Sequence, residues 1–143
     1  MVRVGPSPVD GRGMFAVEDI HVGTSLGFYM GTQTLTSDPN NDSDYSLHLN
    51  ARPPWISPKD WQTKGHHVDP KDWDDDEMPL KFVNSSTRQH RKNIHVTAQG
   101  EYVCCRKIPA PKELFAGHGK FLSKPACEGT CGHRRCATLR AAV

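Results

Sequence analysis

The chain has 143 residues and a formal net charge of +2. This length is typical of a single domain, and so small a net charge argues against a nucleic-acid-binding protein. Hydrophobic residues make up 36% of the chain and are interrupted by 11 prolines and 12 glycines, which favours short strands and turns over long helices. No signal peptide or membrane-spanning stretch is visible, so we expect an intracellular protein, nuclear or cytoplasmic, with no membrane partner.

The first third of the chain is expected to be β-structure. Short strands are predicted at 2–4 and 14–17, on either side of a glycine-containing loop. A third strand is predicted at 25–30 and is expected to end at Gly31, because glycine weakens a strand. Residues 32–35 are expected to continue the same sheet.

The rest of the chain combines short strands with irregular segments. Residues 45–49 alternate between polar and apolar side chains, which is typical of a half-buried strand. Residues 52–76 are rich in Pro, Trp and Asp and show no clear periodicity. A helical turn is predicted at 78–83, a hairpin over 94–105 and a last short strand at 114–116.

Three groups of residues form a pattern that is informative only in combination. The first is Asp10-Gly11-Arg12-Gly13-Met14-Phe15-Ala16, which a plain hairpin loop would also explain. The second is Phe82-Val83-Asn84-Ser85-Ser86, followed by Asn93, which alone would fit an ordinary Asn/Ser-rich turn. The third is Glu113-Leu114-Phe115, followed by His118. In this order the three groups resemble the SET domain, the fold of protein-lysine methyltransferases that use S-adenosylmethionine.

The resemblance covers most of residues 1–122 and implies a fold. That fold is mostly β, built of small sheets with few short helices and a knot-like crossing of the chain near its C-terminal end. Residues 1–122 would form the SET domain, and residues 123–143 would form a separate tail that resembles the post-SET segment of many family members.

The resemblance also implies which residues bind S-adenosylmethionine. In the family, the loop that matches Gly11, Arg12 and Gly13 lies against the methionine part of the cofactor through main-chain groups. Glycine suits this role because it lets another molecule approach the backbone closely. Asn84 would lie at the amino-acid end of the cofactor, and the backbone of Ser85 would face its adenine.

Tyr45 and His118 are the residues implied to line the channel for a substrate lysine. The family has a tyrosine where this chain has His118; its ring excludes water and its hydroxyl orients the amine. An imidazole is shorter, but its nitrogen can also donate or accept a hydrogen bond. The implied activity is methyl transfer to a lysine ε-amine of a basic protein or peptide, such as a histone tail. The alternative is a catalytically inactive SET module that binds a peptide or partner, and His118 is its main support.

Five cysteines in such a chain favour thiols or metal ligands over a disulfide framework. Cys127, Cys131 and Cys136 resemble the post-SET tail, in which three cysteines bind zinc together with a cysteine of the Asn-His-Ser-Cys motif. Thr87 occupies that fourth position here, and His133 could complete the tetrahedral ligand set instead. A basic, thiol-bearing tail without metal is the alternative.

The chain also contains two runs of charged residues and a pair of adjacent cysteines. The acidic run at 72–77 and the basic run at 88–92 are most simply solvated loops, although the acidic run could also attract a basic peptide. No aromatic residue interleaves the basic run, which argues against a site for single-stranded nucleic acid. Cys104 and Cys105 are predicted to be core thiols.

Overall fold

The computed structural model describes residues 1–35, 37–38 and 43–117. Within these residues the chain forms ten strands, one short α-helix and one 3₁₀ helix. In chain order these are β1 (Val2–Pro6), β2 (Arg12–Ala16), β3 (Ser25–Phe28), β4 (Thr32–Thr34), β5 (Leu47–His48), α1 (Pro58–Thr63), β6 (His67–Asp69), the 3₁₀ helix η1 (Pro79–Phe82), β7 (Asn84–Ser85), β8 (Ile94–Val96), β9 (Glu101–Cys104) and β10 (Phe115–Ala116). The predicted mostly β fold is confirmed. Neither helix of these ranges has the length and hydropathy needed to cross a membrane.

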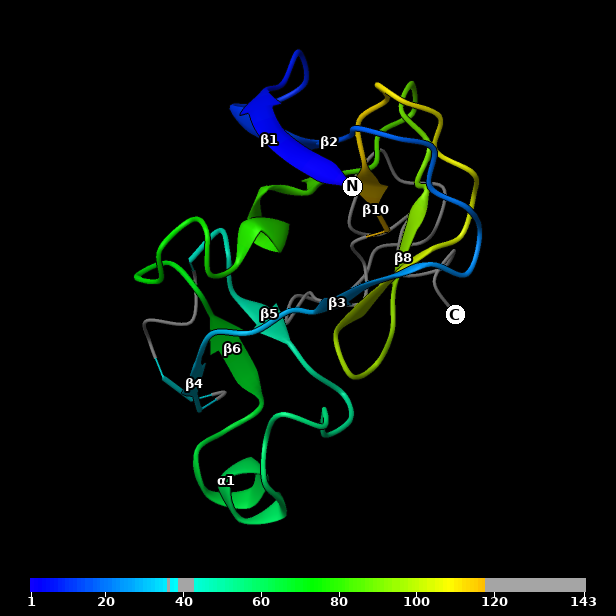
Figure 1. Cartoon of the computed structure of the whole chain (residues 1–143). Coiled ribbons are helices and arrows are strands. Elements are labelled where there is room, and N and C mark those ends of the chain that lie inside the picture. Colours follow the sequence, from blue (N-terminus) through cyan, green and yellow to red (C-terminus); the bar gives the residue numbers. More distant parts are fainter. Residues whose placement is uncertain (36, 39–42, 118–143) are drawn as a thin grey trace.

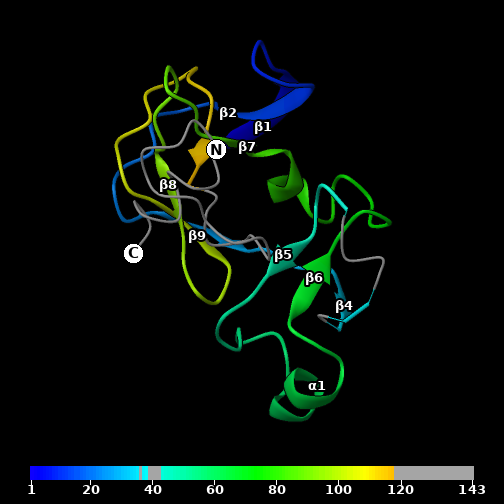
Figure 2. The same cartoon turned by 180° about the vertical axis from the view of Figure 1, so that it is seen from behind.

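The strands form three small sheets. β1 and β2 make an antiparallel pair, a second sheet has the strand order β3-β9-β8-β10-β7, and a third has the order β4-β6-β5. Figures 1 and 2 show the third sheet and α1 at one end of the molecule and the β1–β2 pair at the other. The predicted hairpin over 94–105 is confirmed as β8 and β9, and the predicted helical turn at 78–83 as η1.

β10 is inserted between β7 and β8 and runs parallel to both. Asn93, which is 7% exposed, holds it there. The side-chain amide of Asn93 donates to the carbonyl oxygen of Glu113 at 3.0 Å, and its Oδ1 accepts from the backbone N–H of Phe115 at 2.7 Å. The knot-like crossing stays a prediction, because the residues after Gly117 lie outside the described part of the chain.

The prediction that residues 32–35 continue the sheet of β3 is wrong. β3 pairs with β9, whereas β4 pairs with β6 in the three-stranded sheet. Gly31 lies between the two strands, and a Cβ at this position would come within 2.5 Å of the backbone of Asp69. The chain therefore passes from one sheet to the next where only glycine fits.

Helix α1 lies in the segment 52–76, which shows no clear periodicity in the sequence. None of its residues is buried, so it has no apolar periodicity to detect. Its start is nevertheless marked in the sequence, because Ser57 caps the backbone N–H of Asp60 and Pro58 follows at the first helical position. The strand predicted at 45–49 is shorter than expected and contains only Leu47–His48.

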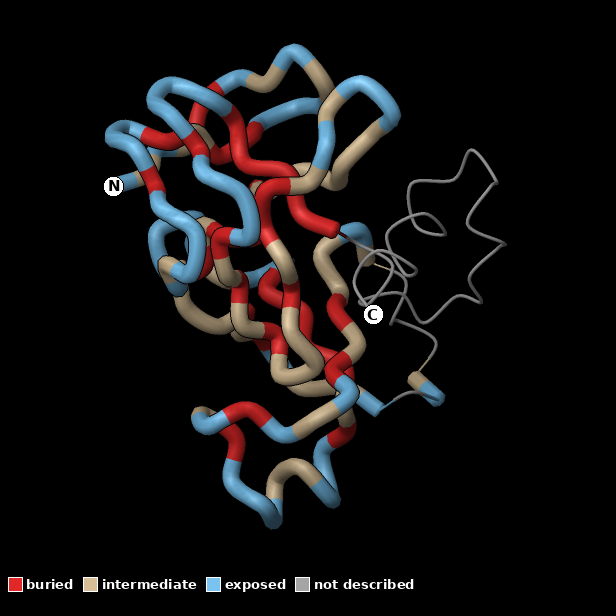
Figure 3. Tube along the Cα trace, turned by 90° about the vertical axis from the view of Figure 1, so that its right-hand side faces the viewer, coloured by how far each residue is buried: buried red, intermediate tan, exposed pale blue. Residues whose placement is uncertain are grey.

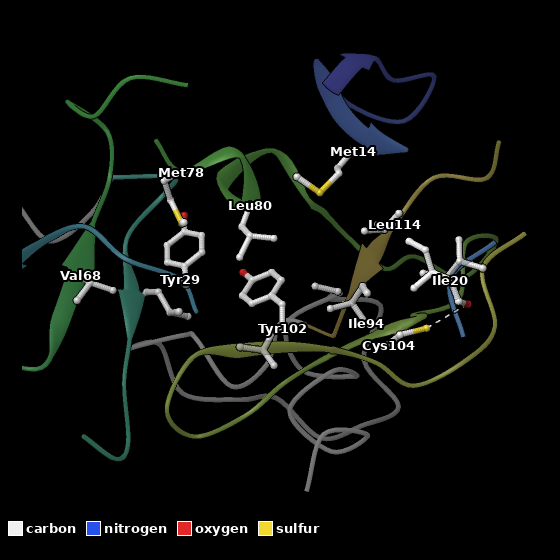
Figure 4. Close-up of a cluster of buried hydrophobic side chains, with 14 of the residues drawn as sticks. Met14, Ile20, Tyr29, Val68, Met78, Leu80, Ile94, Tyr102, Cys104 and Leu114 are labelled. Atoms are coloured by element: carbon white, nitrogen blue, oxygen red, sulfur yellow. Dashed lines mark hydrogen bonds between the residues drawn. The ribbon is translucent and has the colours of Figure 1, made fainter. Parts of the chain in front are cut away.

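The buried core connects the sheets to one another. Its labelled side chains in Figure 4 include Met14 from β2, Val68 from β6, Ile94 from β8 and Tyr102 from β9. Burying one large apolar side chain stabilises the folded state by about 1.5–3 kcal/mol. The packing of this shared core is therefore the main interaction that holds the sheets together. Figure 3 shows buried positions recurring through the interior of the molecule and exposed ones mainly at its outer turns.

The prediction of two core thiols is half right. Cys104 belongs to this core, and its Sγ donates to the carbonyl oxygen of Arg106 at 3.0 Å. Cys105 is exposed, because it follows the last residue of β9 and no longer faces the core.

Candidate functional site

The glycine loop and Asn84, which lie far apart in the sequence, are in direct contact. The side-chain amide of Asn84 donates to the carbonyl oxygens of Asp10 at 3.1 Å and Arg12 at 3.2 Å. It also donates to Oε2 of Glu113 at 2.9 Å. The structure therefore brings together the two segments that were predicted to bind the cofactor.

Glu113 also stabilises the contact between the glycine loop and Asn84, a role that the sequence pattern does not predict. The residue is 8% exposed, and both oxygens of its carboxylate accept from Oγ of Ser7 at 2.9 Å. A Cβ on Gly13 would collide with the same carboxylate. Gly13 is thus required for packing against Glu113, which is a structural reason for a glycine that was predicted only as a cofactor residue.

The other end of the loop is open. Gly11 has a φ of +48°, in the left-handed region that favours glycine, and no heavy atom lies within 4 Å of the position of a Cβ there. The side chain of Arg12 turns away to Asp75, with a distance of 3.0 Å from Nη2 to Oδ2, and its guanidinium lies 4.3 Å from the ring centre of Phe82. A ligand could therefore approach the backbone at Gly11, whereas the Arg12 side chain is already engaged.

A cavity of about 70 Å³ contains two more of the predicted residues, Tyr45 and Ser85. It is lined by Tyr29, Asp44, Tyr45, Ser46, Leu47, Leu80, Lys81, Val83, Ser85 and Tyr102. Ser85 follows Asn84 directly in β7, so the cavity lies next to the contact between the glycine loop and Asn84. The predicted lysine-channel residue and the predicted cofactor residues thus belong to one region of the molecule.

Two buried, stacked tyrosines lie next to Tyr45, and one of them forms a hydrogen bond with its backbone. Oη of Tyr29 donates to the backbone carbonyl of Tyr45 at 2.7 Å, and the rings of Tyr29 and Tyr102 stack at 5.6 Å, side by side below Met78 and Leu80 in Figure 4. Burial raises the pKa of Tyr29 well above its usual value, and the neighbouring Tyr102 adds to the effect. Burial also raises the pKa of Tyr102. Both hydroxyls therefore stay protonated at neutral pH.

One residue that lines the cavity, Lys81, carries a positive charge that the sequence pattern does not single out. The Lys81 side chain is 4% exposed, and its Nζ donates to the carbonyl oxygen of Trp73 at 2.9 Å and lies 3.0 Å from Oδ1 of Asp75. Hydrogen bonds from Lys81 and Arg12 lower the pKa of Asp75. Asp75 belongs to the acidic run at 72–77, so part of that run is paired internally and is not a free solvated loop.

The remaining predicted site residues lie outside the described part of the chain. These are His118 and the tail residues Cys127, Cys131 and Cys136, together with His133. Their roles and the division at residue 122 stay predictions. Among residues 1–35, 37–38 and 43–117, no group of three or more His, Cys, Asp or Glu side chains is arranged to hold a metal ion.

The chain was compared with known proteins by sequence and by structure. No family model and no curated protein sequence matches it. Among solved structures, it is similar to the methyltransferase domain of human PR domain-containing protein 2, with 22% identity and a TM-score of 0.59 over 80% of this chain and 74% of that one. It is also similar to the SET domain of the RIZ1 tumor suppressor (PRDM2), with 22% identity and a TM-score of 0.55 over 80% of this chain and 67% of that one. The chain has the fold of a SET domain.

Proposed function

We propose that this chain transfers a methyl group from S-adenosylmethionine to a lysine ε-amine of a protein. The observation that carries the proposal is the contact between the glycine loop and Asn84, next to a cavity lined by Tyr45 and Ser85. The SET-domain fold supports it. The backbone at Gly11 is accessible, and the backbone of Ser85 follows Asn84 directly in β7. Main-chain groups of both residues could therefore contact the cofactor.

The residues of the site would act mainly by positioning. When bound, S-adenosylmethionine supplies a methyl group on a positively charged sulfur, and such a displacement depends on alignment of the amine. Tyr45, whose backbone is held by Tyr29, would form one wall of the amine channel. His118 would orient the amine through a ring nitrogen, and only in its neutral form, because an imidazolium would repel the substrate.

The substrate we propose is a basic segment of a protein, such as a histone tail. Asp72, Asp74, Asp76 and Glu77 are exposed beside the paired Asp75. Their summed charge would attract a basic peptide toward the cavity over a range limited by the ionic strength. A histone substrate would also require a nuclear protein, and the nucleus is one of the two locations expected from the sequence.

The test is label transfer from radiolabelled S-adenosylmethionine to core histones and to a cell lysate. We expect transfer by the wild-type protein, loss of transfer in His118→Ala, and a fall in rate on acidification, because the imidazolium form would repel the substrate ammonium. Unaltered transfer by His118→Ala would show that another residue occupies the tyrosine position.

The second candidate is an inactive module that binds a peptide or partner, and the histidine at position 118 favours it. It predicts calorimetric binding of S-adenosylmethionine or its demethylated product without transfer to any protein. In that case His118→Tyr would be expected to restore measurable transfer.

A further inference from the structure

The cavity beside Tyr45 has a buried lysine, Lys81, in its lining. Nζ of Lys81 lies 5.6 Å from the ring centre of Tyr45 and 5.4 Å from that of Phe82. At these distances an ammonium is attracted to the aromatic faces. Buried lysines are rare and need partners, and Lys81 has two, the carbonyl of Trp73 and the carboxylate of Asp75.

The charge of Lys81 is only partly compensated. Its carboxylate partner, Asp75, is 49% exposed and shared with the guanidinium of Arg12. Asp44 also lines the cavity, but it is exposed, so solvent and salt screen it. The phenols of Tyr29 and Tyr102 are neutral, as their raised pKa values require. The lining of the cavity therefore combines a buried, partly compensated cation with the exposed carboxylate of Asp44.

We propose that Lys81 is a specificity-determining residue of the methyl transfer, because its ammonium makes the cavity select the neutral form of the incoming amine. The inference rests on the proposed function. A free lysine has a pKa of ~10.4, so nearly all of it is charged at neutral pH. A like charge nearby disfavours that charged form, and the neutral form is the nucleophile.

Lys81 then acts on the incoming amine before transfer. Its buried ammonium favours release of the substrate's proton to solvent. The lone pair of the neutral amine forms the new N–CH₃ bond while the bond from sulfur to that methyl group breaks. Because Asp75 offsets part of the Lys81 charge, removing the Asp75 charge should strengthen the selection, and removing the Lys81 charge should abolish it.

The first experiment compares the pH dependence of methylation in four proteins. Lys81→Met should move the rise in rate with pH to the alkaline side by about one pH unit, and Asp75→Asn should move it to the acid side. Lys59→Met is the matched control, since Lys59 is an exposed lysine on α1, and it should match the wild type. Superimposable profiles for wild type and Lys81→Met would overturn the inference. Any effect of Asp75→Asn through Arg12 would appear separately, as a change in calorimetric affinity for the demethylated cofactor.

The second experiment does not depend on activity. Butylammonium and 1-butanol, a charged and a neutral probe of similar size, are titrated at neutral pH while NMR follows the ring signals of Tyr45. Wild type should bind the neutral probe more tightly, and Lys81→Met should improve the relative affinity for the charged probe about tenfold, the equivalent of one pKa unit.

Each outcome of the probe titration decides the inference. Equal probe preference in wild type and Lys81→Met, or no response of Tyr45 to either probe, would overturn it. If Lys81→Met does not fold, Asp75→Asn must show a weaker relative affinity for the charged probe than wild type. Absence of methylation in wild type would contradict the proposed function and not the charge selection by the cavity, because the probe titration measures that selection separately.

Discussion

Asn84 has a structural task in addition to the one that the resemblance implies. Its amide group reaches three oxygen atoms, two on the glycine loop and one on Glu113. An amide has only two hydrogens to donate, so the three contacts share them. Any weakening of ligand binding in a variant of Asn84 would therefore include the cost of releasing the loop.

We expect Asn84→Ala to affect both ligand binding and folding. Loss of the amide should weaken binding of the demethylated cofactor by about 1.5–3 kcal/mol and lower the free energy of unfolding by about 1–3 kcal/mol, because the partly buried Glu113 carboxylate loses a donor. Calorimetry and urea denaturation measure the two effects. Asn50→Ala, at an exposed asparagine, is the control; equal effects of the two substitutions would contradict the prediction.

Two histidines face each other across β5 and β6. The ring centres of His48 and His67 are 4.7 Å apart, and neither ring nitrogen of His67 has a hydrogen-bond partner within the described residues. Burial lowers the pKa of both side chains, and the neighbouring His66 contributes to the shift in each. Both rings are therefore held neutral inside the fold.

This pair should make stability fall with acidification. An unfolded histidine has a pKa of about 6.5, so below that pH the unfolded chain binds more protons than the folded one. The stability is complete above about pH 6.5 and is lost progressively as the pH falls toward the lower folded pKa values. Urea denaturation on either side of this pH measures the change. His67→Phe should flatten the dependence, and His21→Phe, at an exposed histidine, should not; identical slopes for the two variants would refute the role of the pair.

At the scale of elements, Asn93 determines whether β10 can join its sheet. Its side chain satisfies one backbone donor and one backbone acceptor of the segment that leads into β10. Asn93→Ala should leave both buried groups without a partner and cost about 2 kcal/mol or more of unfolding free energy. Asn93→Asp keeps the acceptor for the Phe115 N–H but buries a carboxylate against the carbonyl oxygen of Glu113, so it should cost more. Urea denaturation of both variants checks this order, and a reversed order would disprove it.

The elements differ in how far the sequence predicts them. β8 and β9 are predictable because their alternation is regular and Gln99-Gly100 marks the turn between them. Strand β4 is assigned to the wrong sheet from sequence, because the choice between sheets depends on the close approach of Gly31 to Asp69. Such long-range packing leaves no periodic trace in the chain.

The candidate site is predictable to a similar extent. Motif order predicts that Gly11, Asn84 and Tyr45 lie in one region. The structure brings the glycine loop into contact with Asn84, next to a cavity lined by Tyr45, whereas the roles of these residues stay predictions. Motif order does not identify Ser7 or the charge on Lys81 as parts of the site. Their importance comes from partners distant in the sequence, Glu113 and Asp75, and no local pattern records such pairs.

At the scale of the whole molecule, we propose that the tail at 123–143 binds one zinc ion through Cys127, Cys131 and Cys136, with His133 or a water as fourth ligand. Elemental analysis of protein purified without chelator should then find about one zinc per chain. Cys127→Ser should lose the metal, whereas Cys105→Ser, at an exposed thiol outside the tail, should retain it. Metal-free protein with three freely titrating tail thiols would contradict the proposal.

The hydrogen bond from Ser7 to Glu113 joins residues 106 positions apart in the chain. During synthesis at about 5–20 residues per second, the loop that contains Gly11 leaves the ribosome several seconds before its anchor has been made. β7 and β8 likewise wait for β10, which pairs with both of them. A nascent or truncated chain that ends before Glu113 would thus have a glycine loop held by Asn84 alone and two unpaired strand edges, and edges of that kind favour aggregation.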